Sequence, residues 1–126
     1  MLTGTKNFKP AEMNSRVSGQ VPEHLCDNAQ ELLENLQVLR DELNAPITII
    51  SGWRSKLHND QVGGAKNSQH LYARAADIKV KGVHPVDVYN KVLELIKAGK
   101  MKKGGVGLYG GWVHYDCRGV NRRWKG

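Results

Sequence analysis

A stripe of leucines at helical spacing is the feature that most restricts the fold of this 126-residue chain. Within the range 22–43, apolar side chains recur every three or four positions. They are Leu25, Ala29, Leu32, Leu33, Leu36, Leu39 and Leu43. This period predicts one long amphipathic helix, with Pro22 suited to its first turn. A chain of this length forms one domain around one core, so we assign the stripe to that core.

Two further segments predict strands that pack beside the helix. Ile47–Ser51 is a short β-branched run that follows Pro46, which is typical of a buried strand. Ala75–Val80 alternates between apolar residues and residues of other kinds. Because successive side chains of a strand point to opposite faces, Asp77 should lie on the face turned away from the core.

A β-hairpin is predicted near the end of the chain. Its strands are Val106–Tyr109 and Trp112–Cys117, and the two glycines at 110–111 form the turn between them. The second strand places His114 on the same face as Trp112 and Asp116. If this strand pairs antiparallel with the strand at 75–80, Asp77 and His114 become neighbours on the solvent-facing side.

These elements together predict an α+β fold. A second helix is expected from Pro85 to about Ala98, with Gly99 as its stop. We expect a single domain over residues 1–126, with residues 1–20 as an irregular N-terminal arm. A small antiparallel sheet would carry both helices on one face and a cleft on the other. The polar loop at 53–67 is long for a small domain, so we expect it to line that cleft.

His70, Asp77 and His114 are the residues that point to chemistry. Two imidazoles and a carboxylate are ligands that a catalytic zinc ion takes while its fourth position stays open for water or substrate. Each residue also has a simpler interpretation, because a histidine in isolation is more often a surface or hydrogen-bonded group than a ligand. The spacing permits a metal site without proving one.

The formal net charge of +7 indicates a preference for polyanions. Nucleic acid, acidic membrane surfaces and bacterial wall polymers all qualify, and charge does not choose among them. Part of the charge lies in the closing stretch 118–125, beside Trp124, which we interpret as a segment that attracts ligands without forming a site. Nucleic-acid binding rests on charge alone, since only 6% of the residues are aromatic and no known nucleic-acid-binding motif is present. We therefore expect no nucleic-acid partner.

The two cysteines and the termini carry little functional signal. Cys26 and Cys117 lack the spacing of a zinc or redox motif, and two buried free thiols are expected in preference to a single bridge. The first residues do not resemble a signal peptide, and no later segment approaches membrane-spanning length. We expect synthesis in a cytoplasm, no membrane insertion, and action after release from the cell or as part of a virion.

Several blocks of the sequence resemble one known family. They are Ser51–Ser55, His58-Asn59, Val62–Ala65, the run Ser68–Ile78, and Val113–Asp116 followed by Arg118-Gly119. Order and spacing match the zinc peptidases of the D-alanyl-D-alanine carboxypeptidase family (peptidase family M15), which also contains L-alanyl-D-glutamate endopeptidases of phage lysins. The chain looks most like small stand-alone members from phages and bacteria, and the resemblance covers roughly Phe8 to Trp124.

The resemblance implies roles for individual residues. His70, Asp77 and His114 correspond to zinc ligands. Arg54 corresponds to an arginine that stabilises negative charge at the reacting carbonyl, although a surface salt bridge is the simpler interpretation. Ser68 corresponds to a serine that contacts substrate, and a turn-capping hydroxyl is the alternative.

Two departures from the family pattern bear on activity. Ala73 stands where the family usually has glycine, and its small side chain should be tolerated. Gly111 stands where many relatives carry a glutamate or aspartate that acts as general base. The nearest carboxylate is Asp116, which is assigned either as a replacement base or as a partner that orients a ligand histidine.

The sequence therefore predicts a zinc metallopeptidase that hydrolyses an amide in the peptide stem of peptidoglycan, of carboxypeptidase or endopeptidase type. Zinc supplies a hydroxide nucleophile near neutral pH, and Arg54 would stabilise the oxyanion. The alternative is a catalytically weak or silent zinc domain that binds cell wall or belongs to a phage particle. The glycine at position 111 keeps that alternative open.

Overall fold

A five-stranded sheet forms the centre of the computed structural model, which describes residues 2–126. The strands, in spatial order, are β1 (Ile47–Ser51), β2 (Ala75–Val80), β4 (Val113–Asp116), β3 (Gly105–Leu108) and β5 (Arg122–Lys125). The pairs β1–β2, β2–β4 and β3–β4 are antiparallel, whereas β3 and β5 are parallel. The predicted α+β class is confirmed, but the expectation of a purely antiparallel sheet was wrong because the tail adds a parallel edge strand.

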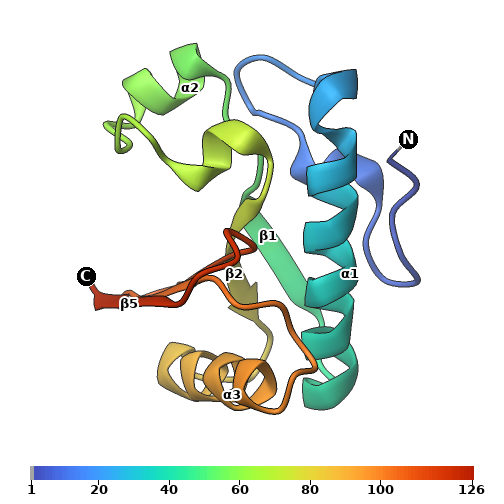
Figure 1. Cartoon of the computed structure of the whole chain (residues 1–126), viewed down its shortest axis with the longest axis vertical. Helices are drawn as coiled ribbons and strands as arrows, with labels where there is room; N and C mark the ends of the chain where they lie inside the picture. The colour runs from blue at the N-terminus through green and yellow to red at the C-terminus, as the bar shows by residue number, and fades with distance from the viewer. Residues whose placement is uncertain (1) are drawn as a thin grey trace.

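Two helices cover one face of this sheet, α1 (Cys26–Leu43) and α3 (Pro85–Lys97). Figure 1 shows α1 running along one side of the molecule, with α3 crossing at one end of the sheet. Four leucines of α1 are fully buried in one cluster with strand residues such as Ile78, Val113 and Tyr115, whereas Leu43 is partly buried. The four are Leu32, Leu33, Leu36 and Leu39. The predicted core role of the leucine stripe is therefore confirmed, and burial of these side chains is the main stabilising contribution.

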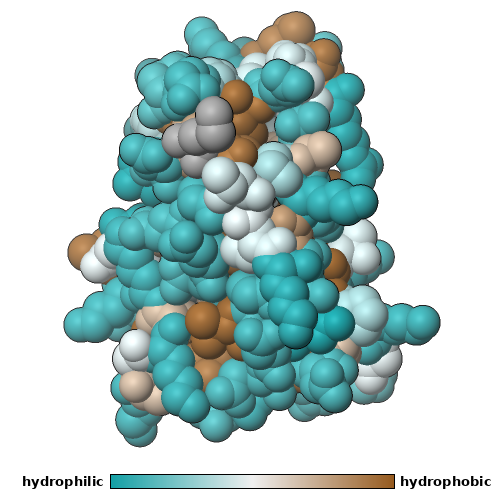
Figure 2. All heavy atoms as spheres, turned by 90° about the vertical axis from the view of Figure 1, so that its right-hand side faces the viewer, coloured by the Kyte–Doolittle hydropathy of each residue, from teal (hydrophilic) through white to brown (hydrophobic). Residues whose placement is uncertain are grey.

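The outer side of α1 is polar. Figure 2 views the molecule from the side that carries α1, and this surface is mostly hydrophilic with small hydrophobic spots. The helix begins at Cys26 and not at Pro22, because residues 23–25 form a 3₁₀ turn (η2, Glu23–Leu25). It ends at Leu43, and the capping residue Asn44 adopts the left-handed conformation typical of a helix C-terminus. None of the helices within residues 2–126 combines the length and apolar character needed to cross a membrane.

Residues 2–20, part of the stretch expected to form an irregular arm, contain short pieces of ordered structure. Within it, η1 (Pro10–Met13) is a 3₁₀ turn, and Ser15 forms an isolated bridge with Gly19. Phe8 and Met13 are buried in the core, and the Met13 carbonyl accepts a hydrogen bond from the Trp53 backbone. The segment is therefore packed against the domain.

The polar loop at 53–67 contains a helix that the sequence analysis did not predict. This helix, α2 (Lys56–Gln61), is short and lacks an apolar period. Ser55 caps it by accepting a hydrogen bond from the His58 backbone N–H. A 3₁₀ turn, η3 (Gln69–Tyr72), then leads into β2.

One row of residues crosses the sheet on the face opposite to α1 and α3. Backbone pairing aligns Ser51 with Asp77, Asp77 with His114, His114 with Gly107, and Gly107 with Trp124. Asp77 and His114 are thus direct cross-strand neighbours, as the alternation predicted. A register shift between Ile49 and Ser51 in β1 brings the serine into this row.

The two cysteines lie on the core side. Cys26 and Cys117 are both buried and free, as predicted. Burial raises the pKa of the Cys117 thiol to about 12. It therefore behaves as a small apolar side chain with no reactive thiolate.

Candidate metal centre

His70, Asp77 and His114 converge into one buried cluster. One donor atom from each residue lies within 4.8 Å of the other two. All three residues are buried, with 3%, 8% and 7% exposure, respectively. His70 comes from η3, Asp77 from β2 and His114 from β4, so three separate segments of the chain must fold before the cluster exists.

The ring of His70 is oriented by a backbone carbonyl. Its Nδ1 lies 2.7 Å from the Gly52 oxygen, which can only accept a hydrogen bond, so Nδ1 carries a proton. The remaining nitrogen, Nε2, then has a lone pair and lies 3.4 Å from Oδ2 of Asp77. This is the arrangement by which proteins fix the tautomer of a metal-binding histidine.

The ring of His114 is oriented from behind by Asp116. His114 Nε2 donates to Oδ2 of Asp116 at 2.7 Å, and Nδ1 lies 3.2 Å from Oδ1 of Asp77. The two imidazoles thus turn different ring nitrogens toward the Asp77 carboxylate, Nε2 in His70 and Nδ1 in His114. Their rings meet edge to face, with centroids 5.3 Å apart.

Asp116 is completely buried and has both oxygens occupied. Oδ1 accepts from the backbone N–H of Gly105 at 2.8 Å and from Nε of Arg118 at 2.9 Å. Oδ2 accepts from Nη2 of Arg118 at 2.8 Å and from His114. The two arginine contacts form a forked ion pair, which is the strong geometry for this side chain. Neither oxygen is left free to take up a proton from another group.

The pKa values follow from burial and from these contacts. Burial alone would raise the pKa of Asp77, but hydrogen bonds with His114 and His70 outweigh burial and hold it well below its usual value. Burial likewise raises the pKa of Asp116, yet the hydrogen bonds from His114, Arg118 and the Gly105 backbone together lower it below its usual value. Both carboxylates are ionised at neutral pH, and an ionised Asp77 is the form that binds a metal.

The two histidines differ in the direction of their shifts. Burial lowers the pKa of His70, only partly offset by the hydrogen bond to Asp77. Burial also acts to lower the pKa of His114, but hydrogen bonds to Asp116 and Asp77 raise it overall. A positive charge between two carboxylates is therefore favourable at His114. A metal cation placed among the same groups would meet the same negative potential.

Arg54 borders the cluster from the loop that follows β1. Its Nη2 lies 3.3 Å from Oδ2 of Asp77, its Nε donates to the Ser51 hydroxyl at 3.1 Å, and its Nη1 approaches the Asn59 side-chain oxygen at 3.3 Å. Burial lowers the pKa of the guanidinium, and the Asp77 carboxylate opposes that shift. These three contacts fix the Arg54 side chain beside the cluster.

Ser68 and Ala73 bracket the turn that carries His70. The Ser68 hydroxyl accepts from the His70 backbone N–H at 3.2 Å and caps η3, while the residue also lines the cleft beside the cluster. Ala73 is buried in a left-handed conformation with φ of 56°. Glycine adopts this conformation without strain, which gives a physical reason for the glycine that the family resemblance implies here.

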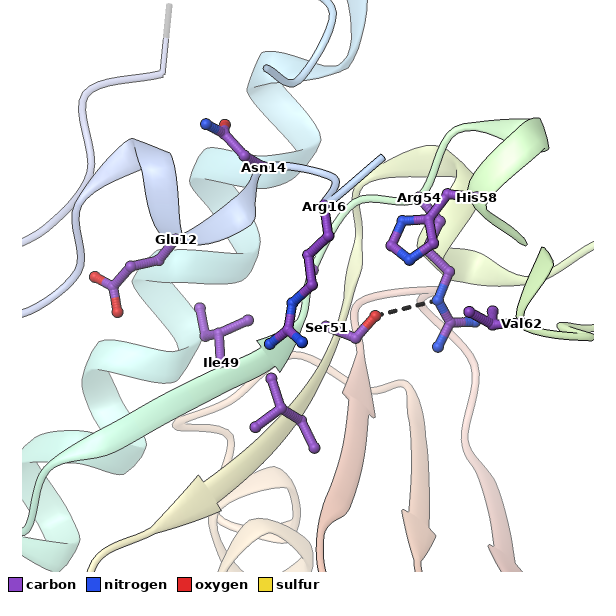
Figure 3. A pocket seen from close by; sticks show the side chains of 10 residues that line it. Glu12, Asn14, Arg16, Ile49, Ser51, Arg54, His58 and Val62 are labelled. Atoms are coloured by element: carbon purple, nitrogen blue, oxygen red, sulfur yellow. Dashed lines mark hydrogen bonds between the residues drawn. The ribbon is translucent and has the colours of Figure 1, made fainter. Parts of the chain in front are cut away.

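His58 does not join the cluster. It lies in a separate hollow on the other side of Arg54, lined also by Glu12 and Arg16. Figure 3 shows its ring beside the Arg54 side chain, whose bond to Ser51 is drawn as a dashed line. The ring nitrogen Nδ1 pairs with the Ser15 hydroxyl at 2.9 Å. His58 is a hydrogen-bonded structural residue.

An aromatic and basic wall beside His114 was not predicted. The Trp124 ring lies 4.9 Å from the His114 ring, and its Nε1 donates to the Tyr109 hydroxyl at 2.8 Å. Tyr109 in turn stacks on Trp112 at 4.6 Å. The clustering of Trp124 with arginines at 122 and 123 was visible in the sequence, but nothing in that pattern places the segment against the metal cluster.

Comparison with known proteins identifies the family. The model of the Peptidase M15 family matches residues 6–116. The chain belongs to the Peptidase M15 family. A relative from Haemophilus influenzae, the probable peptidoglycan L,D-endopeptidase MepK, is 32% identical over 136 aligned residues, which span 96% of this chain and 68% of the relative. The zinc D-Ala-D-Ala carboxypeptidase of Streptomyces albus G is 44% identical over 52 residues, 40% of this chain and 20% of that protein.

These matches confirm the family resemblance drawn from the sequence. Zinc, the predicted cofactor, is supported both by a relative in the Peptidase M15 family that is named for this metal and by the buried cluster. The chemistry of the cluster fits zinc as well. Two imidazole nitrogens and one carboxylate face a common point, and each imidazole has its other nitrogen engaged by an acceptor.

Proposed function

We propose that this member of the Peptidase M15 family is a zinc-dependent hydrolase that cleaves an amide bond in the peptide stem of bacterial peptidoglycan. The observation that carries the proposal is the convergence of His70, Asp77 and His114 with both imidazoles locked by outer acceptors. The printed names of the two relatives support the substrate class. The basic character of the chain suits an anionic wall.

In this proposal His70 Nε2, His114 Nδ1 and a carboxylate oxygen of Asp77 hold the zinc ion. Bound zinc polarises the amide carbonyl and makes a water-derived nucleophile available near neutral pH. The Gly52 carbonyl and Asp116 keep the ligand nitrogens aimed at the metal. Because these supports are already in place, little side-chain entropy remains to be lost when the metal binds.

Arg54 is the group proposed to stabilise negative charge that develops on the carbonyl oxygen. It stays protonated despite its lowered pKa, and its fork of donors is already oriented by Ser51 and Asn59. It lines the same cleft as the three cluster residues. A donor that is fixed before the reaction stabilises the transition state without a cost of reorganisation.

Of the two roles considered for Asp116, the geometry favours orientation of His114 over proton transfer. The carboxylate has no exposed surface, and each oxygen already accepts at least two hydrogen bonds. Among the described residues that line the cleft, Asp77 is the single carboxylate. Gly111 offers no functional group, so proton transfer falls to the metal site or to solvent.

The lack of a carboxylate base in the cleft keeps the silent-domain alternative worth testing. Purified protein with one equivalent of zinc should be incubated with defined stem peptides, and the products identified by mass spectrometry. Cleavage that stops on chelation supports the peptidase, and the product masses distinguish carboxypeptidase from endopeptidase action. Binding of the peptides without any cleavage would overturn the proposed activity in favour of a wall-binding module.

A further inference from the structure

The C-terminal strand β5 forms one wall of the metal cleft. The Peptidase M15 match ends at residue 116, so Arg118 and the whole of β5 lie beyond it. Arg122 and Trp124 nevertheless line the same cleft as His70, Asp77 and His114. The last ten residues therefore add a surface to the site that the family match does not cover.

Two glycines of β3 allow this wall to reach the cluster. Gly107 separates His114 from Trp124 in the row across the sheet, and Gly105 occupies the equivalent position beside Arg122. A Cβ atom at Gly107 would lie 2.3 Å from Nε1 of Trp124, so only glycine leaves room for the indole. With that space free, the Trp124 ring lies over β3 and approaches the ring of His114.

Arg122 is the basic residue of this wall with a free side chain. Because residues i and i+2 of a strand share a face, Arg122 points to the same side as Trp124. Within residues 2–126 its guanidinium makes no hydrogen bond or ion pair, whereas Arg118 is tied to Asp116 and Arg123 to the Gly104 carbonyl. The exposed guanidinium lies at the opposite edge of the sheet from Arg54.

We propose that Arg122 and Trp124 form a carboxylate-binding subsite on the β5 side of the cleft, which selects substrates that carry a free carboxylate on that side of the scissile amide. The guanidinium supplies a forked, permanently charged donor for the carboxylate. The indole supplies a flat apolar surface for the adjoining aliphatic part of the peptide. This inference rests on the proposed function and narrows its substrate class.

The test uses zinc-loaded protein and a set of stem peptides in which each carboxylate in turn is replaced by its amide. For the wild type, amidation of one particular carboxylate should raise KM about tenfold, the size expected for loss of a charge-assisted hydrogen bond. In Arg122→Gln the same amidation should change KM by less than about twofold, with kcat nearly unchanged. Arg122 is exposed, so this variant should fold.

Lys125→Gln is the matched control. It removes one positive charge from the same strand, but its side chain lies on the other face of β5 and does not line the cleft. The control should keep the wild-type preference for the free carboxylate. Equal changes in both variants would mean general electrostatic attraction and would overturn the subsite, as would an unchanged preference in Arg122→Gln.

The outcome remains separable from the proposed function. If zinc-loaded wild type cleaves none of the peptides, the peptidase proposal fails, and the same peptides are then compared by calorimetric Kd. A loss of affinity on amidation that disappears in Arg122→Gln still supports the subsite. If neither the amidation nor the Arg122→Gln substitution changes the affinity, the proposed subsite is overturned.

Discussion

At the centre of the sheet, both faces of strands β2 and β4 hold buried side chains, but of opposite kinds. On the core face, Ile78 lies beside Val113 beneath the helices α1 and α3. On the other face, Asp77 lies beside His114 with exposures of 8% and 7%. Neighbouring residues on one strand, one turned to each side, therefore face an apolar core and a charged cluster.

The difference shows what burial requires of each kind of side chain. An apolar side chain gains stability by leaving water and needs only close packing. A charged side chain loses hydration, so it must be supplied with partners. Each imidazole of the cluster has such a partner outside it, the Gly52 carbonyl for His70 and Asp116 for His114. The core face stabilises the fold, and the polar face is organised for binding.

The largest effect is expected when the polar face loses a proposed metal ligand. Asp77→Asn should abolish zinc-dependent peptide cleavage, because a neutral amide is a much poorer zinc ligand than a carboxylate. Lys79→Asn is the matched control, since it changes an exposed residue on the same face of the same strand. Cleavage rates should be measured at equal protein and zinc concentrations. Near-wild-type activity in Asp77→Asn would contradict the view that the polar face is organised for zinc binding.

The next effect is expected on the core face. Ile78→Ala should lower the free energy of unfolding by about 2–5 kcal/mol, because it removes buried methyl groups and leaves a cavity. Zinc bound per folded chain should stay at the wild-type level, since the substituted side chain points away from the cluster. Urea denaturation together with metal analysis checks both statements. Loss of zinc without loss of stability would show that the two faces are not separable.

A smaller effect is expected behind His114. Asp116→Asn should weaken zinc binding by about 10–100-fold, because the imidazole loses the carboxylate that orients it. Tyr115→Phe tests the neighbouring position on the core face, where the hydroxyl donates to the Lys102 carbonyl at 2.8 Å. That variant should cost only about 1 kcal/mol of stability and leave zinc affinity unchanged. Competition with a chromophoric chelator measures the affinities, and equal affinities for Asp116→Asn and wild type would exclude the orienting role.

Much of the fold could be read from periodicity. The strand at 75–80 followed from alternation, because side chains along a strand repeat every two residues. Alternation also placed Asp77 and His114 on one face, but their neighbourhood was predicted only on the condition that the two strands pair. The edge strand at 122–125 could not be read this way, since its sequence Arg-Arg-Trp-Lys carries no apolar alternation. Its parallel pairing with β3 depends on space left by Gly105 and Gly107, which is a tertiary property.

The candidate site was predicted less completely than the strands. His70 was proposed as a ligand from its residue type and from the family resemblance, but no pattern in the sequence shows that its ring turns toward Asp77. That placement depends on the Ser68 cap and on the Gly52 carbonyl, 18 residues earlier in the chain. The forked contact of Arg118 with Asp116 was also missed, because its closing stretch was interpreted only as basic charge. Contacts of both kinds depend on how individual side chains are oriented and leave no periodic signal.

The most direct test of the zinc site is the metal content of the purified wild-type protein and of His70→Ala. The metal content is measured by inductively coupled plasma mass spectrometry after removal of loosely bound metal. We predict about one zinc ion per chain for the wild type and a large loss for His70→Ala. His24→Ala, which changes a histidine outside the cluster, should retain the wild-type content. Unchanged zinc in His70→Ala would contradict the assignment of His70, Asp77 and His114 as the metal site.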